Sequence, residues 1–114
     1  MIVEDKEYSV AFEATERRVR FEGQLRLRSP RDYGPVLELL RAAHQSGLDS
    51  LTLDFRNLDM LNSSGIGTIG AFLVEVRKAK NMSIIVLGSA NKRWQGRTLA
   101  TLKKIWPQVE LIID

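Results

Sequence analysis

The sequence contains no cysteine and a single histidine, His44. Without cysteine, the chain can form neither disulfides nor a thiolate nucleophile or metal ligand. With one histidine, neither a metal site nor a Ser-His-Asp triad can be assembled around that residue. No pair of carboxylates is placed for acid–base work. The sequence therefore predicts a protein that is not an enzyme and holds no metal or cofactor.

Long apolar runs are also missing. None is longer than the run from Ile84 to Leu87, which is far too short to span a bilayer. The first seven residues include three acidic ones and no apolar segment of the kind found in signal peptides. Hydrophobic residues make up 44% of the sequence and charged residues 27%, which suits a globular protein. We expect one domain, residues 1–114, located in the cytoplasm and without a membrane span.

Acidic residues are scarce in the second half of the chain. Between Val76 and Val109 there are eight basic residues and none that is acidic, whereas Met1 to Glu75 is net negative. A basic half can attract nucleic acid or an acidic protein. No nucleic-acid-reading motif accompanies it, and Trp94 among the basic residues is more typical of packing than of base stacking. We favour solvated helix faces and expect no nucleic-acid partner.

The hydrophobic pattern predicts an α/β fold. Residues 7–13 and 18–22 alternate between apolar and polar, which indicates two strands joined by a hairpin turn at 14–16. Further on, apolar residues at helical spacing alternate with short apolar runs. The predicted helices cover the segment from Pro30 to Gly47, residues 64–80 and residues 91–106. The predicted strands cover residues 51–55, 82–87 and 109–113. This order implies a mostly parallel sheet with helices on both faces. The loops after Phe55 and Leu87 should then lie close together at one edge.

One local motif stands between a predicted strand and a predicted helix, and it reads Asn62-Ser63-Ser64-Gly65-Ile66-Gly67. Either Asn62 or Ser63 can cap the helix. A Ser-Ser pair at a helix start is often no more than a cap. A phosphate at an exposed hydroxyl there would meet free N–H groups and the positive end of the helix dipole. The residues alone leave a structural cap and a modification site both open.

The glycines from Gly65 to Gly70 spell G-x-G-x-x-G, the dinucleotide-binding pattern. That fingerprint requires the glycines directly after a strand and an acidic residue about 20 positions later. Here the predicted strand ends at Phe55, and no acidic residue lies between Glu75 and Glu110. We therefore expect the glycines to permit close packing of the helix.

The stretch from Leu51 to Gly67, LTLDFRNLDMLNSSGIG, resembles the signature of STAS domains of the anti-sigma-factor-antagonist type. That signature has an apolar strand ending in Asp, an eight-residue loop and then Asp-Ser-Ser-Gly opening a helix. Phe21 to Leu25 and IIVLGSANKRW also look like the family. The resemblance implies a STAS-like mixed, mostly parallel sheet with an N-terminal strand hairpin and three helices, the family's C-terminal helix being absent.

The resemblance also implies a site. In anti-sigma factor antagonists the first serine after the Asp is the phosphoacceptor, which here is Ser63, with Ser64 as the second choice. The partner-binding face implied by the motif consists of Asp59, Asn62, Ser63, Ser64, Gly65, Thr68 and Phe72. For Phe72 we leave open whether it contacts a partner or fills the seam against a neighbouring helix.

By resemblance, the protein is a partner-switching regulator. Its partners would be a serine protein kinase that doubles as the anti-sigma factor, of the histidine-kinase-like ATPase class, and a serine phosphatase. Unphosphorylated Ser63 would permit binding of the kinase. Two departures, Asn62 in place of Asp and the absent last helix, favour an alternative: a STAS interaction subunit of a transport or signalling complex that is not regulated by phosphorylation. The absent helix also leaves a homodimer open.

Overall fold

The computed structural model describes residues 1–114. It consists of six strands, three α-helices and one short 3-10 helix, which follow one another as β1 (Ile2–Glu4), β2 (Tyr8–Glu13), β3 (Arg18–Leu25), η1 (Pro30–Tyr33), α1 (Gly34–His44), β4 (Ser50–Leu61), α2 (Ser63–Ala79), β5 (Ser83–Gly88), α3 (Gln95–Ile105) and β6 (Glu110–Ile113). The expected α/β fold, with an antiparallel N-terminal hairpin, a mostly parallel sheet and three helices, is confirmed.

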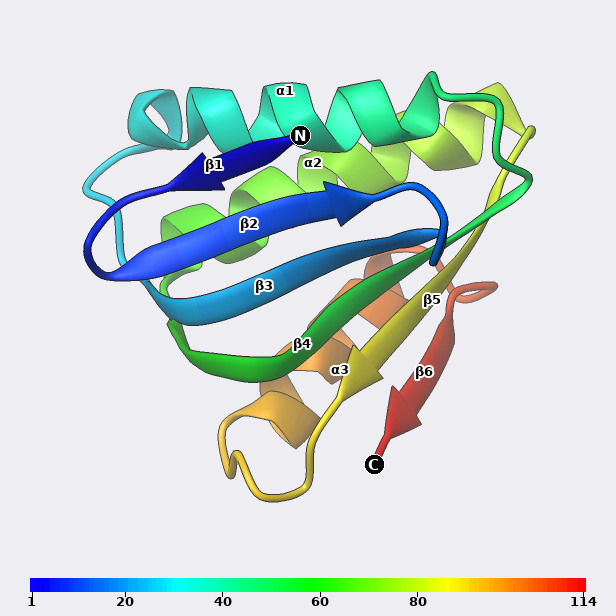
Figure 1. Cartoon of the computed structure of the whole chain (residues 1–114). Coiled ribbons are helices and arrows are strands. Elements are labelled where there is room, and N and C mark those ends of the chain that lie inside the picture. The colour runs from blue at the N-terminus through cyan, green and yellow to red at the C-terminus, as the bar shows by residue number, and fades with distance from the viewer.

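The six strands form one sheet in the order of the chain, β1-β2-β3-β4-β5-β6. The first three strands are antiparallel, and β3 to β6 are parallel neighbours. All three α-helices lie behind the sheet in Figure 1. Right-handed crossovers that always step to the next strand in the same direction place every helix on the same face. The expectation of helices on both faces is therefore wrong.

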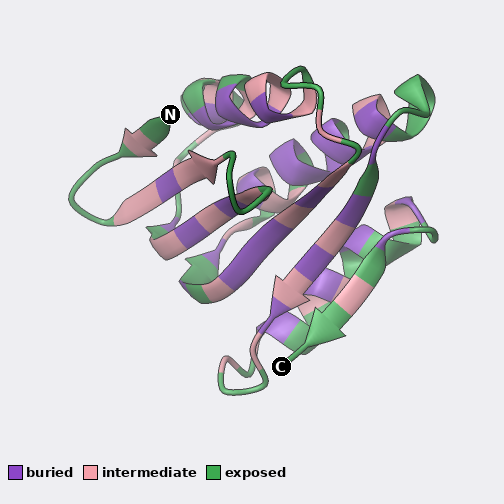
Figure 2. Ribbon diagram, turned by 45° about the vertical axis from the view of Figure 1, so that its right-hand side comes forward, coloured by how far each residue is buried: buried purple, intermediate pink, exposed green.

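The core lies between the sheet and the helices. Alternate residues of the central strands point into it and are fully buried, as the purple bands on the strands in Figure 2 show. At its centre the rings of Phe21 on β3 and Phe55 on β4 stack with their centroids 4.4 Å apart. The apolar stripes of α1 and α2, which include Leu39, Leu40 and Leu73, close the core from behind.

The helix-free face of the sheet carries a network of ion pairs. Asp54 on β4 is only 3% exposed, and its carboxylate binds Arg56 at 3.0 Å and Arg18 at 3.5 Å. Arg18 and Arg20 on β3 both bind Glu13 on β2. Burial alone would raise the pKa of Asp54, but the hydrogen bonds and charges of its arginine neighbours outweigh burial and lower it below the ordinary value. Charges thus occupy a sheet face that no helix covers.

Two strands differ from the expected bounds. The predicted loop after Phe55 is the continuation of β4, which runs to Leu61 beside β3. Gly23, which directly follows the predicted strand 18–22, lies inside β3 with φ +87°, next to a shift in register. A Cβ there would lie too close to the carbonyl oxygen of Glu7. The register shifts between Arg20 and Glu22 and between Gly23 and Gln24 each place one extra residue in β4. These extra residues break the alternation of β4 after Phe55, which is why its second half was predicted as a loop.

Two boundaries were misplaced near the ends of the chain. β1 was not predicted, because three residues are too few to show a period. The third helix begins at Gln95 rather than at Asn91, and turns occupy the residues between.

Candidate functional site

Asn62 is the residue that caps α2. Its Oδ1 atom accepts hydrogen bonds from the backbone N–H of Gly65 at 3.0 Å and from the hydroxyl of Tyr33 at 2.7 Å. Its Nδ2 atom donates to the carbonyl oxygen of Leu27 at 2.7 Å. One side chain therefore joins three segments: the loop after β3, the 3-10 helix η1 and the first turn of α2. Of the two caps that the sequence left open, the structure selects Asn62.

Tyr33 and Gly65 form the support beneath this cap. Tyr33 is 1% exposed, and burial raises the pKa of its hydroxyl. A Cβ on Gly65 would lie 2.8 Å from the Tyr33 hydroxyl oxygen and too close to Cδ1 of Leu61. Gly65 is thus required for α2 to begin against Tyr33, as we expected of a packing glycine.

Ser63 is the first residue of α2, and its exposed side chain makes no hydrogen bond within the protein. The N–H groups in the first turn of a helix have no intrahelical acceptors. Asn62 accepts from the N–H group of Gly65, and the N–H groups of Ser63 and Ser64 have no acceptor in the protein. Ser64 is half-buried, and its carbonyl oxygen accepts from the Thr68 hydroxyl at 2.9 Å. Of the two serine hydroxyls, that of Ser63 is the more accessible.

A groove with a volume of about 500 Å³ lies beside Ser63. Residues of η1, α1 and α2 line it, namely Pro30, Leu37, Ser63, Ser64, Gly67, Thr68 and Ala71. A Cβ on Gly67 would meet no atom within 4 Å, so this glycine leaves open space in the groove. Arg28 lies before η1 and Arg31 lies within it. Both are exposed and neither forms an ion pair. We call this feature the α1–α2 groove.

The other residues expected at the partner-binding face lie in different surroundings. Asp59 is exposed outside the groove, where its carboxylate pairs with Lys92 Nζ at 2.5 Å. Phe72 is 0% exposed and packs edge to face against the ring of His44, with centroids 6.2 Å apart. The expectation that Phe72 contacts a partner at the surface is therefore wrong, because its ring fills the seam between α1 and α2.

The same seam holds an ion pair that the sequence did not indicate. Arg41 on α1 donates from Nε and Nη2 to the carboxylate of Glu75 on α2, at 3.0 and 2.8 Å. The hydrogen bonds from Arg41 lower the pKa of Glu75. A two-point contact of this kind fixes the angle between the helices that wall the groove.

Gln95 was also missed. It is completely buried, and its Nε2 atom donates to the carbonyl oxygens of Phe55 at 2.6 Å and Leu58 at 3.0 Å, while Oε1 accepts from the N–H of Ser89. It thus joins the segment after Phe55 to the loop after β5, in agreement with the expected proximity of the two segments. A glutamine at a helix start carries no sequence signal for this role.

The structure has no group of three or more His, Asp or Glu side chains arranged to hold a metal ion. None of its helices combines the length and the apolar character needed to cross a membrane.

No family model matches the sequence, and no curated protein matches it. The structure is similar to solved structures of SiaC from Pseudomonas aeruginosa. Apo-SiaC aligns with a TM-score of 0.74 and 15% identity, covering 100% of this chain and 97% of that one. A chain in the complex of the diguanylate cyclase SiaD with its activator SiaC aligns with a TM-score of 0.75 and 15% identity, covering 99% and 97%. A further SiaC structure gives 0.63 and 16%, covering 99% and 93%. The likeness shows a common fold over nearly the whole chain.

Proposed function

We propose that the protein is a non-catalytic, partner-switching regulator of the STAS type, controlled by phosphorylation of Ser63. One observation carries this proposal: the Ser63 hydroxyl is exposed and unused at the start of α2, beside the α1–α2 groove, because Asn62 does the capping. A phosphate there meets free N–H groups and the positive end of the helix dipole, so α2 tolerates it. The modification therefore changes the surface without unfolding the protein.

The groove supports the binding half of the proposal. Pro30, Leu37 and Ala71 give it apolar walls, and Gly67 leaves room for an inserted side chain. A groove of this kind suits an amphipathic helix of a partner protein. A phosphate adds about −1.5 to −2 charges at its rim, and an apolar partner surface cannot cover that charge without desolvating it. Phosphorylated protein should therefore release the partner.

By resemblance to anti-sigma factor antagonists, the partner is a serine protein kinase of the histidine-kinase-like ATPase class that also acts as an anti-sigma factor. A serine phosphatase reverses the modification. The kinase supplies the catalytic base, so the loss of a carboxylate at Asn62 does not remove the chemistry from Ser63.

The second candidate is an interaction subunit that activates a partner enzyme without being phosphorylated. The similarity to SiaC, which is described as the activator of a diguanylate cyclase, favours it. Asn62 favours it as well, because a kinase that reads an acidic residue before the serine finds none here.

Intact-mass spectrometry of the protein from its own host, with peptide mapping of Leu58 to Arg77, separates the two candidates. A phosphate on Ser63 that disappears in Ser63→Ala supports the switch. The constitutive subunit is supported by two results together. Ser63 stays unmodified across growth conditions, and both Ser63→Ala and Ser63→Asp still co-purify with a partner enzyme.

A further inference from the structure

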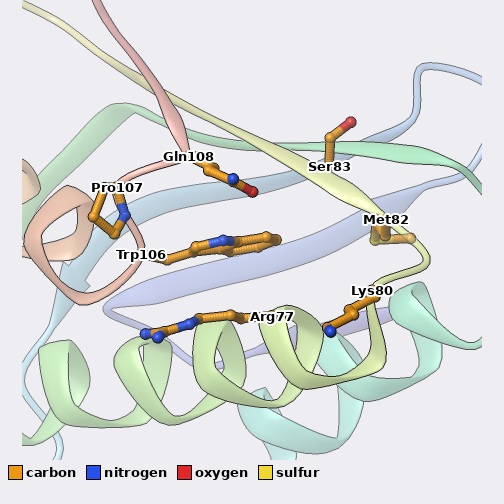
Figure 3. A pocket seen from close by; sticks show the side chains of 7 residues that line it. All are labelled: Arg77, Lys80, Met82, Ser83, Trp106, Pro107 and Gln108. Atoms are coloured by element: carbon orange, nitrogen blue, oxygen red, sulfur yellow. The ribbon is translucent and has the colours of Figure 1, made fainter.

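A second cavity lies at the opposite end of α2 from Ser63 (Figure 3). Its volume is about 680 Å³, and the residues that line it are Arg77, Lys80, Met82, Ser83, Trp106, Pro107 and Gln108. α2 has 17 residues. At about 1.5 Å per residue the cavity lies roughly 25 Å from Ser63 along the helix. It is therefore a separate feature from the α1–α2 groove, and we call it the Trp106 cavity.

The cations of the Trp106 cavity have no counter-charge. Arg77 gives one hydrogen bond, from Nη1 to a main-chain carbonyl at the end of α3, and forms no ion pair. Lys80 forms neither a hydrogen bond nor an ion pair through its side chain. Asp49 reaches the rim of the cavity through its carbonyl oxygen, but its carboxylate pairs with Arg17 at 3.3 Å. The cavity therefore presents uncompensated positive charge.

Trp106 adds a neutral donor. Its indole ring lies between the side chains of Arg77 and Gln108 (Figure 3), and the residue is only 9% exposed. Its Nε1 atom has no acceptor in the protein and is not buried, unlike Nε1 of Trp94, which is buried without a partner. The exposed part of the ring is too small to serve as a stacking platform for a base. The N–H group instead suits a hydrogen-bond acceptor of a molecule bound in the cavity.

The basic surface extends beyond the cavity. Lys78 follows the lining residue Arg77 on α2, and Lys104 lies in the last turn of α3, two positions before Trp106. Both are exposed, and neither forms an ion pair. Basic residues at the ends of two helices stabilise the helix dipoles, which accounts for their position. The dipoles do not account for a concave cavity that holds a guanidinium and an ammonium group without anionic partners and an indole N–H without an acceptor. A surface of this extent fits a polypeptide better than a single small anion.

We propose that the Trp106 cavity is a docking site for an acidic segment of a protein partner, with carboxylates paired to Arg77 and Lys80 and an oxygen of the segment accepting from the Trp106 N–H. Guanidinium and ammonium groups bind carboxylates by charge-assisted hydrogen bonds. The segment would hold the partner at one end of α2 while Ser63 controls contact at the other end. Two linked contacts raise the effective concentration of the partner at the groove.

The fluorescence of Trp106 gives a direct test. The chain has two tryptophans, and Trp94→Phe leaves Trp106 as the only one while removing a buried N–H that has no partner. This variant is titrated with a short synthetic peptide of alternating Glu and Leu at low salt. We expect a saturable change in Trp106 fluorescence. Adding Arg77→Gln and Lys80→Gln should weaken binding by about tenfold or more, because each substitution removes a charge-assisted hydrogen bond.

Matched controls distinguish docking from general attraction. Arg93→Gln with Arg97→Gln removes the same amount of charge from residues that do not line the cavity, and should bind the peptide like the parent. Ser63→Asp should also bind the peptide like the parent, because Ser63 lies at the other end of α2. A failure of the docking proposal is therefore distinguishable from a failure of the Ser63 switch. Equal weakening by both double variants, tighter binding of a single-stranded oligonucleotide than of the peptide, or no response to the peptide would overturn the proposal. If Arg77→Gln reduces the folded fraction, Lys80→Gln alone serves as the test.

Discussion

The side-chain amide of Asn62 donates to the carbonyl oxygen of Leu27 at 2.7 Å, while its oxygen accepts from two donors. The STAS pattern that this segment resembles has Asp at that position. An ionised carboxylate has no proton to donate to a carbonyl oxygen. Asn62 therefore makes a contact that Asp would not make, and it joins the loop after β3 to the helix that carries Ser63.

The first prediction concerns this contact. Asn62→Asp should lower the free energy of unfolding by about 1–2 kcal/mol at neutral pH, because the carboxylate faces the Leu27 carbonyl without a donor. Asn62→Ala should cost about 2–3 kcal/mol, since the bond to Gly65 is lost as well. Urea unfolding measures both. An Asn62→Asp protein at least as stable as the wild type would contradict this account.

The second prediction concerns Ser63. Ser63→Asp should fold normally and gain about 0.3–1 kcal/mol, because it places a negative charge at the positive end of α2. Ser63→Ala should leave stability unchanged, since the hydroxyl makes no hydrogen bond. Thermal unfolding checks both statements. If the Ser63 switch operates, Ser63→Asp fails to retain the partner that Ser63→Ala retains, and equal retention would count against it.

The third prediction compares two neighbouring glycines. Gly65→Ala should destabilise by about 1–3 kcal/mol, because its Cβ would collide with Leu61 and the Tyr33 hydroxyl. Gly67→Ala should stabilise α2 by about 0.5–1 kcal/mol, because a Cβ there meets no atom within 4 Å. The same Cβ projects into free space of the α1–α2 groove and should weaken partner binding. Denaturant unfolding and partner retention, measured on both variants, separate packing from recognition.

The fourth prediction concerns pH. Because the pKa of Asp54 in the folded protein lies below its ordinary value of 3.8, its ion pairs stabilise the fold above about pH 4. That stabilisation is lost as the pH falls through the folded-state pKa. Asp54→Asn should therefore cost about 1–3 kcal/mol at pH 7 and progressively less as the pH falls below about 4. Urea unfolding at neutral pH and in acid measures this difference.

Glu110→Gln is the matched control, because Glu110 is exposed on the same sheet without an ion pair. Its substitution should have little effect at either pH. A cost for Asp54→Asn that is the same in acid as at neutral pH would mean that the loss is steric rather than electrostatic.

Much of the fold was predictable because hydrophobic periods are local properties. The alternation of Val10 and Phe12 on β2, and the helical spacing of Val36, Leu40 and Ala43 on α1, indicate their elements without reference to the rest of the chain. The second half of β4 was not predictable, since two register shifts against β3 each add a residue to β4 and break its alternation. Those shifts depend on pairing with a neighbouring strand that the local sequence does not contain.

The site divides in the same way. A cap at the start of α2 was predictable from residues 62–65, because capping is a local interaction. Tyr33 and Gln95 were missed, since each acts on segments about 30 or more positions away in sequence, as shown by their bonds to Asn62 and Phe55. The open face of the sheet was missed for a related reason: Ile85 and Leu87 are apolar, but the strand order decides which side the helices take.

The strand order has a consequence for how the protein is made. Since every strand pairs with the one synthesised just before it, no strand has to insert between two that are already joined. The sheet can grow from one edge while the chain leaves the ribosome, and each βα unit docks on a surface that already exists. The start of α2, with Ser63, can pack once β4 is in place, before β5, α3 and β6 have emerged. A nascent chain stalled with Ala79 just outside the ribosome, and the remaining residues still in the exit tunnel, should therefore already protect the Asn62 cap from hydrogen exchange.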